Sequence, residues 1–480
     1  MIFNSVEFAL FLPLVFLLYW LIPSDRLQWR NGWLLAASYV FYGWWDWRFL
    51  FLIFFSSILD YTLAIQIHRS KEKRLKRLLL LGSLVTNLGL LFYFKYCNFF
   101  LESFVDSFAF LGQPIDIDRI HIILPVGISF YTFQTLSYTI DVFRGQLKPT
   151  YNLLSFSTFV AFFPQLVAGP IERAVNLLPQ FAIKKYFTYQ QGSEGLRQIL
   201  WGTFKKVVIA DSCALYVNES YQSLGDQSGS TLLLTAILFS FQIYGDFSGY
   251  SDIAIGTARL FGFELKKNFA YPYFSRDIAE FWRRWHISLS TWFRDYLYIP
   301  LGGSRMGTYR NILNVFAIFL VSGFWHGARW NFVLWGGLNA LLFLPLLLTG
   351  INRKNTGEVA GTKLLTILKN LISIGFTFLI VSLVWVFFRS NDVHEISIFF
   401  GKLFSNSLIS APRPFSKWSY IFLVGFILVE WLGRSKLYPL VELQQKVGQL
   451  GRYTIYSLLV FLILFFHKFH SDSEFIYFQF

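Results

Sequence analysis

Two of the seven histidines in this 480-residue chain lie where a lipid-embedded protein should avoid ionisable groups. His326 ends the apolar run 312–325, and His286 lies forty residues earlier, directly after Trp285. An ionisable side chain at membrane depth is by default a functional hypothesis. Imidazole is also the side chain best suited to exchange protons near neutral pH. The two residues therefore predict proton-transfer chemistry inside a membrane protein.

The segment around His286 has the pattern of an amphipathic helix over residues 281–299. At about 100° per residue, its aromatic and leucine side chains gather on one face, and Arg283 and Arg284 lie on the other. His286 falls at the boundary, and Pro300 ends the helix. Such a helix would lie in the membrane interface or line a polar cavity. On local sequence alone we favour an interfacial histidine whose ring bonds a backbone carbonyl over a functional role for His286.

His326 stands between Trp325 and Gly327 at the end of roughly four apolar turns. Glycine at that point allows a backbone or a ligand to approach closely. The alternative is a residue that caps the helix or extends toward the interface, but Arg329 would serve that purpose better. We therefore favour His326 as the catalytic candidate on local grounds.

Two aspartates, Asp246 and Asp252, occur where the stretch 245–249 is expected to interrupt an apolar helix. Irregular backbone at membrane depth survives only where it is buried in protein or faces a water-filled cavity. An aspartate there could orient an imidazole, or it could pair with an arginine. We favour pairing, and the candidate partners are Arg283, Arg284 and Arg294.

Similar breaks are expected at 124–134 and 163–173, where Pro and Gly lie beside hydroxyl or amide side chains. Several broken helices near two histidines predict an internal cavity or tunnel. The supporting residues that we expect at this cavity are Asp246, Asp252, Trp325, Arg283, Arg284 and Gln134.

Composition defines the class of protein. The chain is 55% hydrophobic and only 15% charged, whereas soluble domains carry about 25% charged residues. We predict an all-α, multi-pass membrane protein with roughly ten to twelve crossings, together with re-entrant or horizontal helices. We expect one domain over 1–480, with a catalytic core at about 120–345. The net charge of +14 is typical of basic cytoplasmic loops and does not indicate nucleic-acid binding.

Other chemistries lack their motifs. The sequence contains no P-loop, dinucleotide fingerprint, nucleophile elbow or His-Glu-x-x-His pattern. Neither His286 nor His326 has a partner at metal-ligand spacing, so we predict no metal site. Cys97 and Cys213 alone cannot form a disulfide framework. A channel or transporter with proton-handling histidines stays open as the non-enzyme alternative.

The chain resembles the membrane-bound O-acyltransferase family, and within it the alginate O-acetyltransferase branch. The matching stretches extend from end to end, and they are 1–5, 124–145, 163–173, 244–256, 268–305, 323–339 and 475–480. The resemblance implies that His326 is the catalytic histidine, because it matches the family histidine that ends an apolar helix. His286 matches a second histidine that is associated with activity.

The resemblance further implies a reaction. An acyl thioester, taken to be acetyl-CoA from the cytoplasm, would be the substrate, with no cofactor bound. The acetyl group would pass across the inner (cytoplasmic) membrane of a bacterium to an exopolysaccharide, through periplasmic acetylation partner proteins. His326 would act as general base, and His286 or Asp246 could orient the imidazole or stabilise the oxyanion. Peptidoglycan acetylation and teichoic acid D-alanylation are the alternative acyl transfers.

Overall fold

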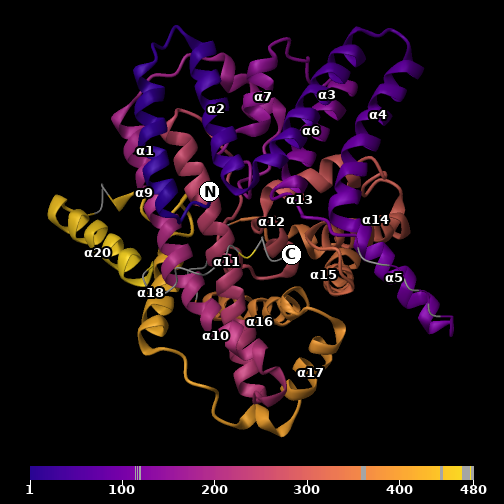
Figure 1. Cartoon of the computed structure of the whole chain (residues 1–480). Helices are drawn as coiled ribbons and strands as arrows, with labels where there is room; N and C mark the ends of the chain where they lie inside the picture. The colour runs from indigo at the N-terminus through magenta and orange to yellow at the C-terminus, as the bar shows by residue number, and fades with distance from the viewer. Residues whose placement is uncertain are drawn as a thin grey trace. The chain divides into compact units, whose positions relative to one another are not determined.

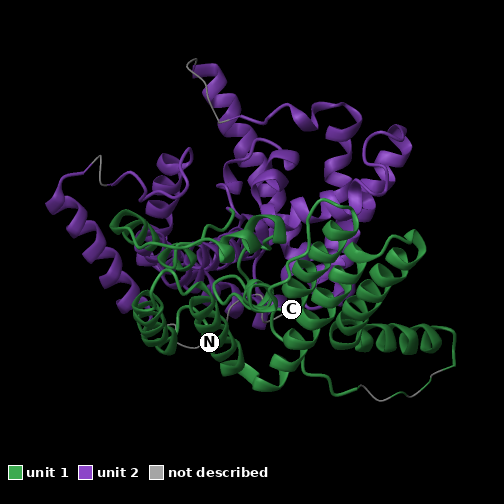
Figure 2. Ribbon diagram, turned by 90° about the horizontal axis from the view of Figure 1, so that it is seen from above, with its two compact units in different colours: residues 1–195, 257–266 green, residues 196–256, 267–480 purple. Residues whose placement is uncertain are grey.

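The chain folds into helices. The computed structural model describes residues 1–113, 115, 117, 120–357, 364–443, 447–467 and 476, and those ranges contain helices and no strand (Figure 1). This confirms the predicted all-α class. Two compact units divide the chain, unit 1 with residues 1–195 and 257–266, and unit 2 with residues 196–256 and 267–480 (Figure 2). The prediction of one catalytic domain concerns function and stays a prediction.

The helices of unit 1 are α1 (Val6–Leu21), α2 (Leu27–Asp46), η1 (Trp47–Phe49), α3 (Leu50–Arg69), α4 (Lys73–Leu91), η2 (Phe92–Tyr96), α5 (Cys97–Phe110), α6 (Ile128–Phe143), α7 (Leu153–Ala161), α8 (Ala174–Leu177) and η3 (Leu178–Ala182). Those of unit 2 are η4 (Lys205–Ala210), α10 (Asp211–Gln222), η5 (Leu224–Asp226), η6 (Pro272–Phe274), α12 (Ile278–Arg284), α13 (Ile287–Phe293), η7 (Arg294–Tyr298), α14 (Gly307–His326), α15 (Trp330–Leu348), η8 (Ile351–Arg353), α16 (Leu364–Arg389), α17 (Val393–Leu403), η9 (Asn406–Ile409), α18 (Lys417–Gly433) and α20 (Gln449–His467). Two helices, α9 (Tyr189–Phe204) and α11 (Gly229–Leu260), contribute residues to both units.

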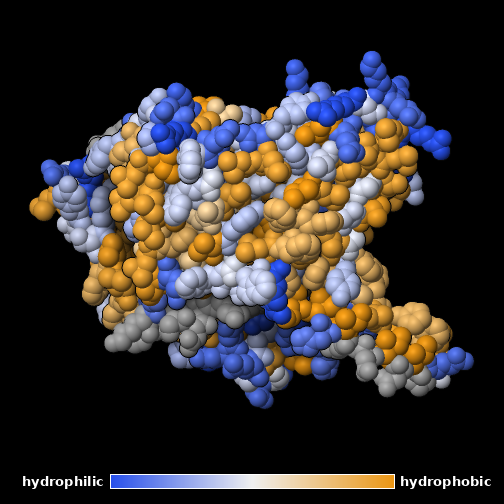
Figure 3. Space-filling model, turned by 45° about the horizontal axis from the view of Figure 1, so that its top comes forward, coloured by the Kyte–Doolittle hydropathy of each residue, from blue (hydrophilic) through white to orange (hydrophobic). Residues whose placement is uncertain are grey.

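Long apolar helices make this a multi-pass membrane protein. In the described part of the chain, six helical segments are long and apolar enough to cross a bilayer: Leu27–Arg69, Lys73–Phe110, Gly229–Leu260, Trp330–Leu348, Leu364–Arg389 and Gln449–His467. Many of their large apolar side chains are exposed, as lipid contact requires, and Figure 3 shows broad apolar areas on the visible face. The exact number of crossings stays a prediction.

In unit 1, the predicted break at 124–134 is confined to 124–127, because residues 128–134 belong to α6, whereas the predicted break at 163–173 is present. The two segments lie against each other. The first ends at Gly127, which has a φ of 74° and precedes α6, and the second occupies the turns after α7. A Cβ atom on Gly127 would lie 2.8 Å from the carbonyl oxygen of Leu166, so only glycine permits this approach. Gln134 and Gln165 then both donate to the carbonyl of Phe159, at 2.7 and 3.0 Å.

In unit 2, the expected interruption at 245–249 is wrong, because α11 runs unbroken from Gly229 to Leu260. The small residues there serve close packing instead. A Cβ atom on Gly249 would lie 2.7 Å from the carbonyl oxygen of Gly202, so the two backbones are in direct contact. This contact brings the buried lysines that follow Gly202 against the aspartates of α11.

The expected single helix over 281–299 is also wrong. The chain forms α12, a break at Trp285 and His286, then α13 and η7. The segment before α12 provides the reason, since Ala270 donates to the carbonyl of Arg284 and Ile287 donates to that of Asn268. These backbone bonds replace the helical ones that a continuous helix would have made.

The hairpin of α14 and α15 positions the end of the long apolar run. The two helices pack backbone to backbone, since a Cβ atom on Gly323 would collide with the carbonyl of Phe332, and one on Gly336 with that of Phe319. This crossing fixes the last turn of α14, which carries His326.

Candidate active site

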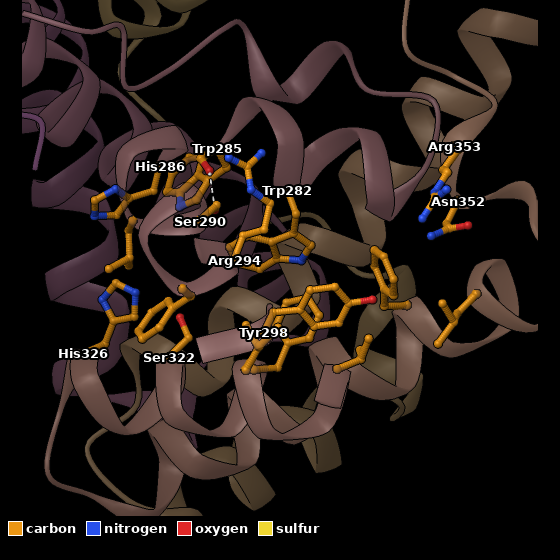
Figure 4. Close-up of a pocket in the computed structure, with 17 residues that line it drawn as sticks. Trp282, Trp285, His286, Ser290, Arg294, Tyr298, Ser322, His326, Asn352 and Arg353 are labelled. Carbon is orange, nitrogen blue, oxygen red and sulfur yellow. Dashed lines mark hydrogen bonds between the residues drawn. The ribbon is translucent and has the colours of Figure 1, made fainter. Parts of the chain in front are cut away.

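The structure brings both histidines to one place in unit 2. Their ring centroids are 6.3 Å apart, and both side chains are buried and line the same cavity (Figure 4). The residues come from different elements, because His326 ends α14 and His286 precedes α13. The forty residues that separate them in the sequence do not by themselves bring them together, but the cavity predicted around the two histidines agrees with this contact.

Aromatic rings surround His326 on several sides. Its imidazole makes edge contacts with Trp335 at 5.4 Å and with Phe388 at 5.2 Å between centroids. Asn331, at the start of α15, donates to the carbonyl of Ser390 at 2.6 Å and so holds the end of α16 in place. This tie keeps Phe388 against the imidazole. The ring therefore has a fixed, largely apolar environment.

The backbone and the ring of His286 are both constrained. Its φ of 44° is left-handed, a conformation that costs an ordinary residue about 1–2 kcal/mol. The ring packs edge-on against Phe247 at 4.7 Å, and its Nδ1 lies 3.2 Å from Oδ1 of Asn268. Burial lowers the pKa of His286 to about 3, so the imidazole is neutral at physiological pH. A strained backbone at a buried titratable group is typical of a functional site.

The cavity has a volume of about 290 Å³ and is mostly apolar. The residues that line it are Trp282, Trp285, His286, Leu289, Ser290, Phe293, Arg294, Tyr298, Val315, Ile318, Phe319, Ser322, His326, Phe343, Leu347, Asn352 and Arg353. Figure 4 shows the histidines at one end and Asn352 and Arg353 at the other. Trp282 Nε1 is buried without a hydrogen-bond partner among the residues that the structure describes. The cavity wall thus provides two imidazoles, a few hydrogen-bond donors and, at the end opposite the histidines, the cation of Arg353.

The aspartates have partners other than the expected arginines. Asp246 pairs with Lys206 at 2.8 Å and accepts a hydrogen bond from the backbone of Ile476 at 2.6 Å. Asp252 pairs with Lys205 at 2.6 Å. Although burial alone lowers the pKa of Lys206, the adjacent carboxylates of Asp246 and Asp211 outweigh it and raise that pKa above its usual range. The expectation that arginines pair with these aspartates is therefore wrong, because Lys205 and Lys206 at the start of η4 occupy both carboxylates.

The three arginines make local contacts instead. Arg284 pairs with Glu280 at 2.6 Å, Arg294 pairs with Asp295, and Arg283 donates to the carbonyls of Asn352 and Asn355. Of the three, only Arg294 lines the cavity.

Two supporting candidates remain. Trp325 packs its indole against both imidazoles, at 5.0 Å from His326 and 6.2 Å from His286, and is not among the lining residues. Gln134 belongs to unit 1, where it binds Phe159. It is not a lining residue of the histidine cavity either.

Sequence reasoning missed Asn268, whose Oδ1 lies 3.2 Å from Nδ1 of His286. Nothing local marks it, because an asparagine in a loop is ordinary and its contact depends on the break after α12. Lys205 and Lys206 were also missed, although two lysines inside the apolar stretch 200–210 are a visible signal. The closing stretch 475–480 lies outside the described residues apart from Ile476.

Comparisons with known proteins identify the family of this chain. The profile of the MBOAT, membrane-bound O-acyltransferase family matches residues 39–388. A probable alginate O-acetylase AlgI of Pseudomonas syringae pv. tomato is 40% identical over 84% of this chain and 75% of its own length. Its counterpart in Azotobacter vinelandii is 41% identical over 84% of this chain and 78% of its own length.

A relative with another acceptor is also similar. The peptidoglycan O-acetyltransferase of Helicobacter pylori is 35% identical over 82% of this chain and 78% of its own length. The family match covers both histidines and the whole wall of the cavity. The resemblance seen in the sequence is confirmed, and the chain belongs to the membrane-bound O-acyltransferase family and is an O-acyltransferase.

Proposed function

We propose that the protein transfers acetyl groups from a cytoplasmic thioester, acetyl-CoA, toward an alginate-like exopolysaccharide, working in the inner membrane with periplasmic partner proteins. The observation that carries the proposal is the convergence of two buried imidazoles on one apolar cavity. The similarity to alginate O-acetylases over 84% of the chain supports the acetyl group and the acceptor.

His326 acts as general base in this proposal. The acceptor oxygen attacks the acyl carbon while its proton passes to the imidazole, the carbon–sulfur bond breaks, and the departing thiolate takes up a proton. General base catalysis of this kind contributes about 10²–10⁴-fold. His286 either accepts a hydrogen bond in this step or donates one to the oxyanion.

The shape of the cavity suits a long donor. If the thioester carbon lies beside the histidines, the rest of the acyl donor can extend past Phe319 and Phe343 toward Arg353. An anionic group on the donor would meet the guanidinium there, since arginine binds phosphate well. The apolar wall between the two ends would exclude water and protect the thioester from hydrolysis.

The test measures polymer-bound acetate in cells that express wild type, His326→Ala or His394→Ala at equal levels. His394 is an exposed histidine of α17 and provides the matched control. We expect the His326 variant to lose acetylation and the control to keep it. Full acetylation by His326→Ala would overturn the assigned role. Proton or solute flux that requires His326 while acyl transfer persists would favour a channel or transporter instead.

A second acceptor is supported by the relative from Helicobacter pylori, which is a peptidoglycan O-acetyltransferase. Teichoic acid D-alanyltransferases also match, but the one from Bacillus subtilis covers only 52% of this chain at 27% identity. Acetate found on purified peptidoglycan rather than on exopolysaccharide would identify peptidoglycan as the acceptor. Ester-linked D-alanine on teichoic acid would identify the reaction as D-alanylation.

A further inference from the structure

Asn268 makes an unusual set of contacts through a single oxygen. Its Oδ1 lies 3.2 Å from the backbone nitrogen of Ser288, 2.9 Å from the Ser288 hydroxyl and 3.2 Å from Nδ1 of His286. Its Nδ2 donates to the hydroxyl of Ser251 at 3.3 Å. All of these groups are buried in unit 2.

These contacts determine which way the amide faces. The backbone nitrogen of Ser288 carries a hydrogen and can only donate, so the atom of Asn268 that faces it must be the acceptor oxygen. The flipped amide would place two N–H donors against one another. The oxygen is therefore also the atom that faces the His286 ring.

The orientation of the amide then fixes the proton on the imidazole. A carbonyl oxygen of an amide cannot donate, so the contact at 3.2 Å is a hydrogen bond only if Nδ1 carries the proton. In the neutral ring the other nitrogen, Nε2, then holds a lone pair. That Nε2 is buried with no hydrogen-bond partner in the described ranges, on a residue that lines the histidine cavity (Figure 4).

We infer that Asn268 is a positioning residue that holds His286 with its proton on Nδ1, so that Nε2 is a hydrogen-bond acceptor toward the reacting groups. The inference rests on the proposed function for its catalytic consequence. In this tautomer the neutral ring has no proton on Nε2 and cannot donate from it to an oxyanion. Of the two roles proposed above, His286 therefore accepts a hydrogen bond. Burial also lowers the pKa of His286, which disfavours the imidazolium that could donate from both nitrogens. The indole of Trp282 and the hydroxyl of Ser322 remain as cavity donors for the oxyanion.

The direct test is magic-angle-spinning NMR of the full protein in lipid, with ¹⁵N-labelled histidine. The His286 signals are those missing from His286→Ala. We expect a protonated Nδ1 and an unprotonated Nε2 in wild type. Asn268→Leu should lose this preference, Asn268→Asp should keep it, and Ser251→Ala, which alters only the other end of the amide, should leave it unchanged. A protonated Nε2 in wild type, or an unchanged tautomer in Asn268→Leu, would overturn the inference.

Kinetics add a second readout. We expect Asn268→Leu to lower kcat with little change in KM, by about 10–100-fold, which is what losing the hydrogen-bond partner of a metal-bound imidazole typically costs. Asn268→Asp should restore most of kcat. A loss in Asn268→Leu that Asn268→Asp does not restore would contradict the positioning role. The tautomer itself does not depend on the reaction, so active His326→Ala would overturn the proposed function and leave the NMR result standing.

Discussion

In unit 2 the two histidines line an apolar cavity, whereas the lysines and aspartates near α9 and α11 pair with one another inside packed helices. Lys206 lies 2.8 Å from both Asp211 and Asp246, and Lys205 lies 2.6 Å from Asp252. The His286 ring faces an amide, and its second nitrogen has no partner in the part of the chain that the structure describes.

The difference separates two uses of buried polar groups. A buried charge is tolerated when an opposite charge and hydrogen bonds compensate its desolvation, and its removal mainly weakens the fold. An acceptor that lines a cavity and has no protein partner adds no contact to the fold and is available to a bound molecule. We therefore expect the histidines to control the reaction and the ion pairs to control the fold.

Removing the histidines should produce the largest change, and at neutral pH it should fall mainly on activity. We expect His286→Ala and His326→Ala each to lower acyl transfer about 10²–10⁴-fold. The double variant should keep as much acyl-transfer activity as the less active single variant, because both groups act on one step. Acetylated polymer and the thermal midpoint of the purified protein provide the measurements. Losses that multiply in the double variant would mean that the two imidazoles act independently.

Breaking an ion pair should affect stability instead. Lys206→Met leaves Asp211 and Asp246 buried without their cation, which typically costs about 3–5 kcal/mol. The amount of folded protein in the membrane and its thermal midpoint should both fall, and Asp246→Asn in the same chain should recover part of the loss. The exposed Lys73→Met is the control. If Lys206→Met lost activity but kept full stability, Lys206 would take part in the reaction. The contrast between catalytic histidines and stabilising ion pairs would then be wrong.

The pH dependence of stability should distinguish His286 from an exposed histidine. The pKa of His286 is about 3 in the folded protein and 6.5 for the free group, so between these values the unfolded chain binds a proton that the folded chain does not. Stability should therefore fall as pH drops from 6.5 toward 3, by up to about 1.4 kcal/mol per pH unit. His286→Gln should flatten this part of the curve of thermal midpoint against pH. His394→Gln should leave the curve unchanged. If the curves of wild type and His286→Gln ran parallel, the neutral, buried state of the His286 ring would be contradicted.

The smallest effect should come from the far end of the cavity. Arg353→Ala removes a cation that lines the end opposite the histidines, and we expect KM for the acyl donor to rise about tenfold or less. The value of kcat should hold, because the guanidinium is remote from the reacting carbon. Lys354→Ala, an exposed neighbour that does not line the cavity, is the matched control. Equal shifts in both variants would point to surface charge rather than to a donor contact.

The class of protein and the candidate catalytic pair were predictable from the amino-acid sequence. Low charge and long apolar runs require membrane-crossing helices, because only a helix satisfies its own backbone hydrogen bonds in lipid. An imidazole in such a run is visible without any structure, and family motifs around His286 and His326 were readable as they stand.

The surroundings of these residues depend on long-range contacts that only the folded chain reveals. A helical wheel assumes an unbroken helix, so it could not anticipate that 268–270 bonds to the backbone around His286 and divides α12 from α13. The small residues at 245–249 are compatible with either a helix break or close helix packing. The contact of Gly249 with Gly202 shows that they serve packing. Long-range pairs such as Lys206 with Asp246 and Asn268 with His286 depend on how the chain returns on itself, which local spacing does not encode.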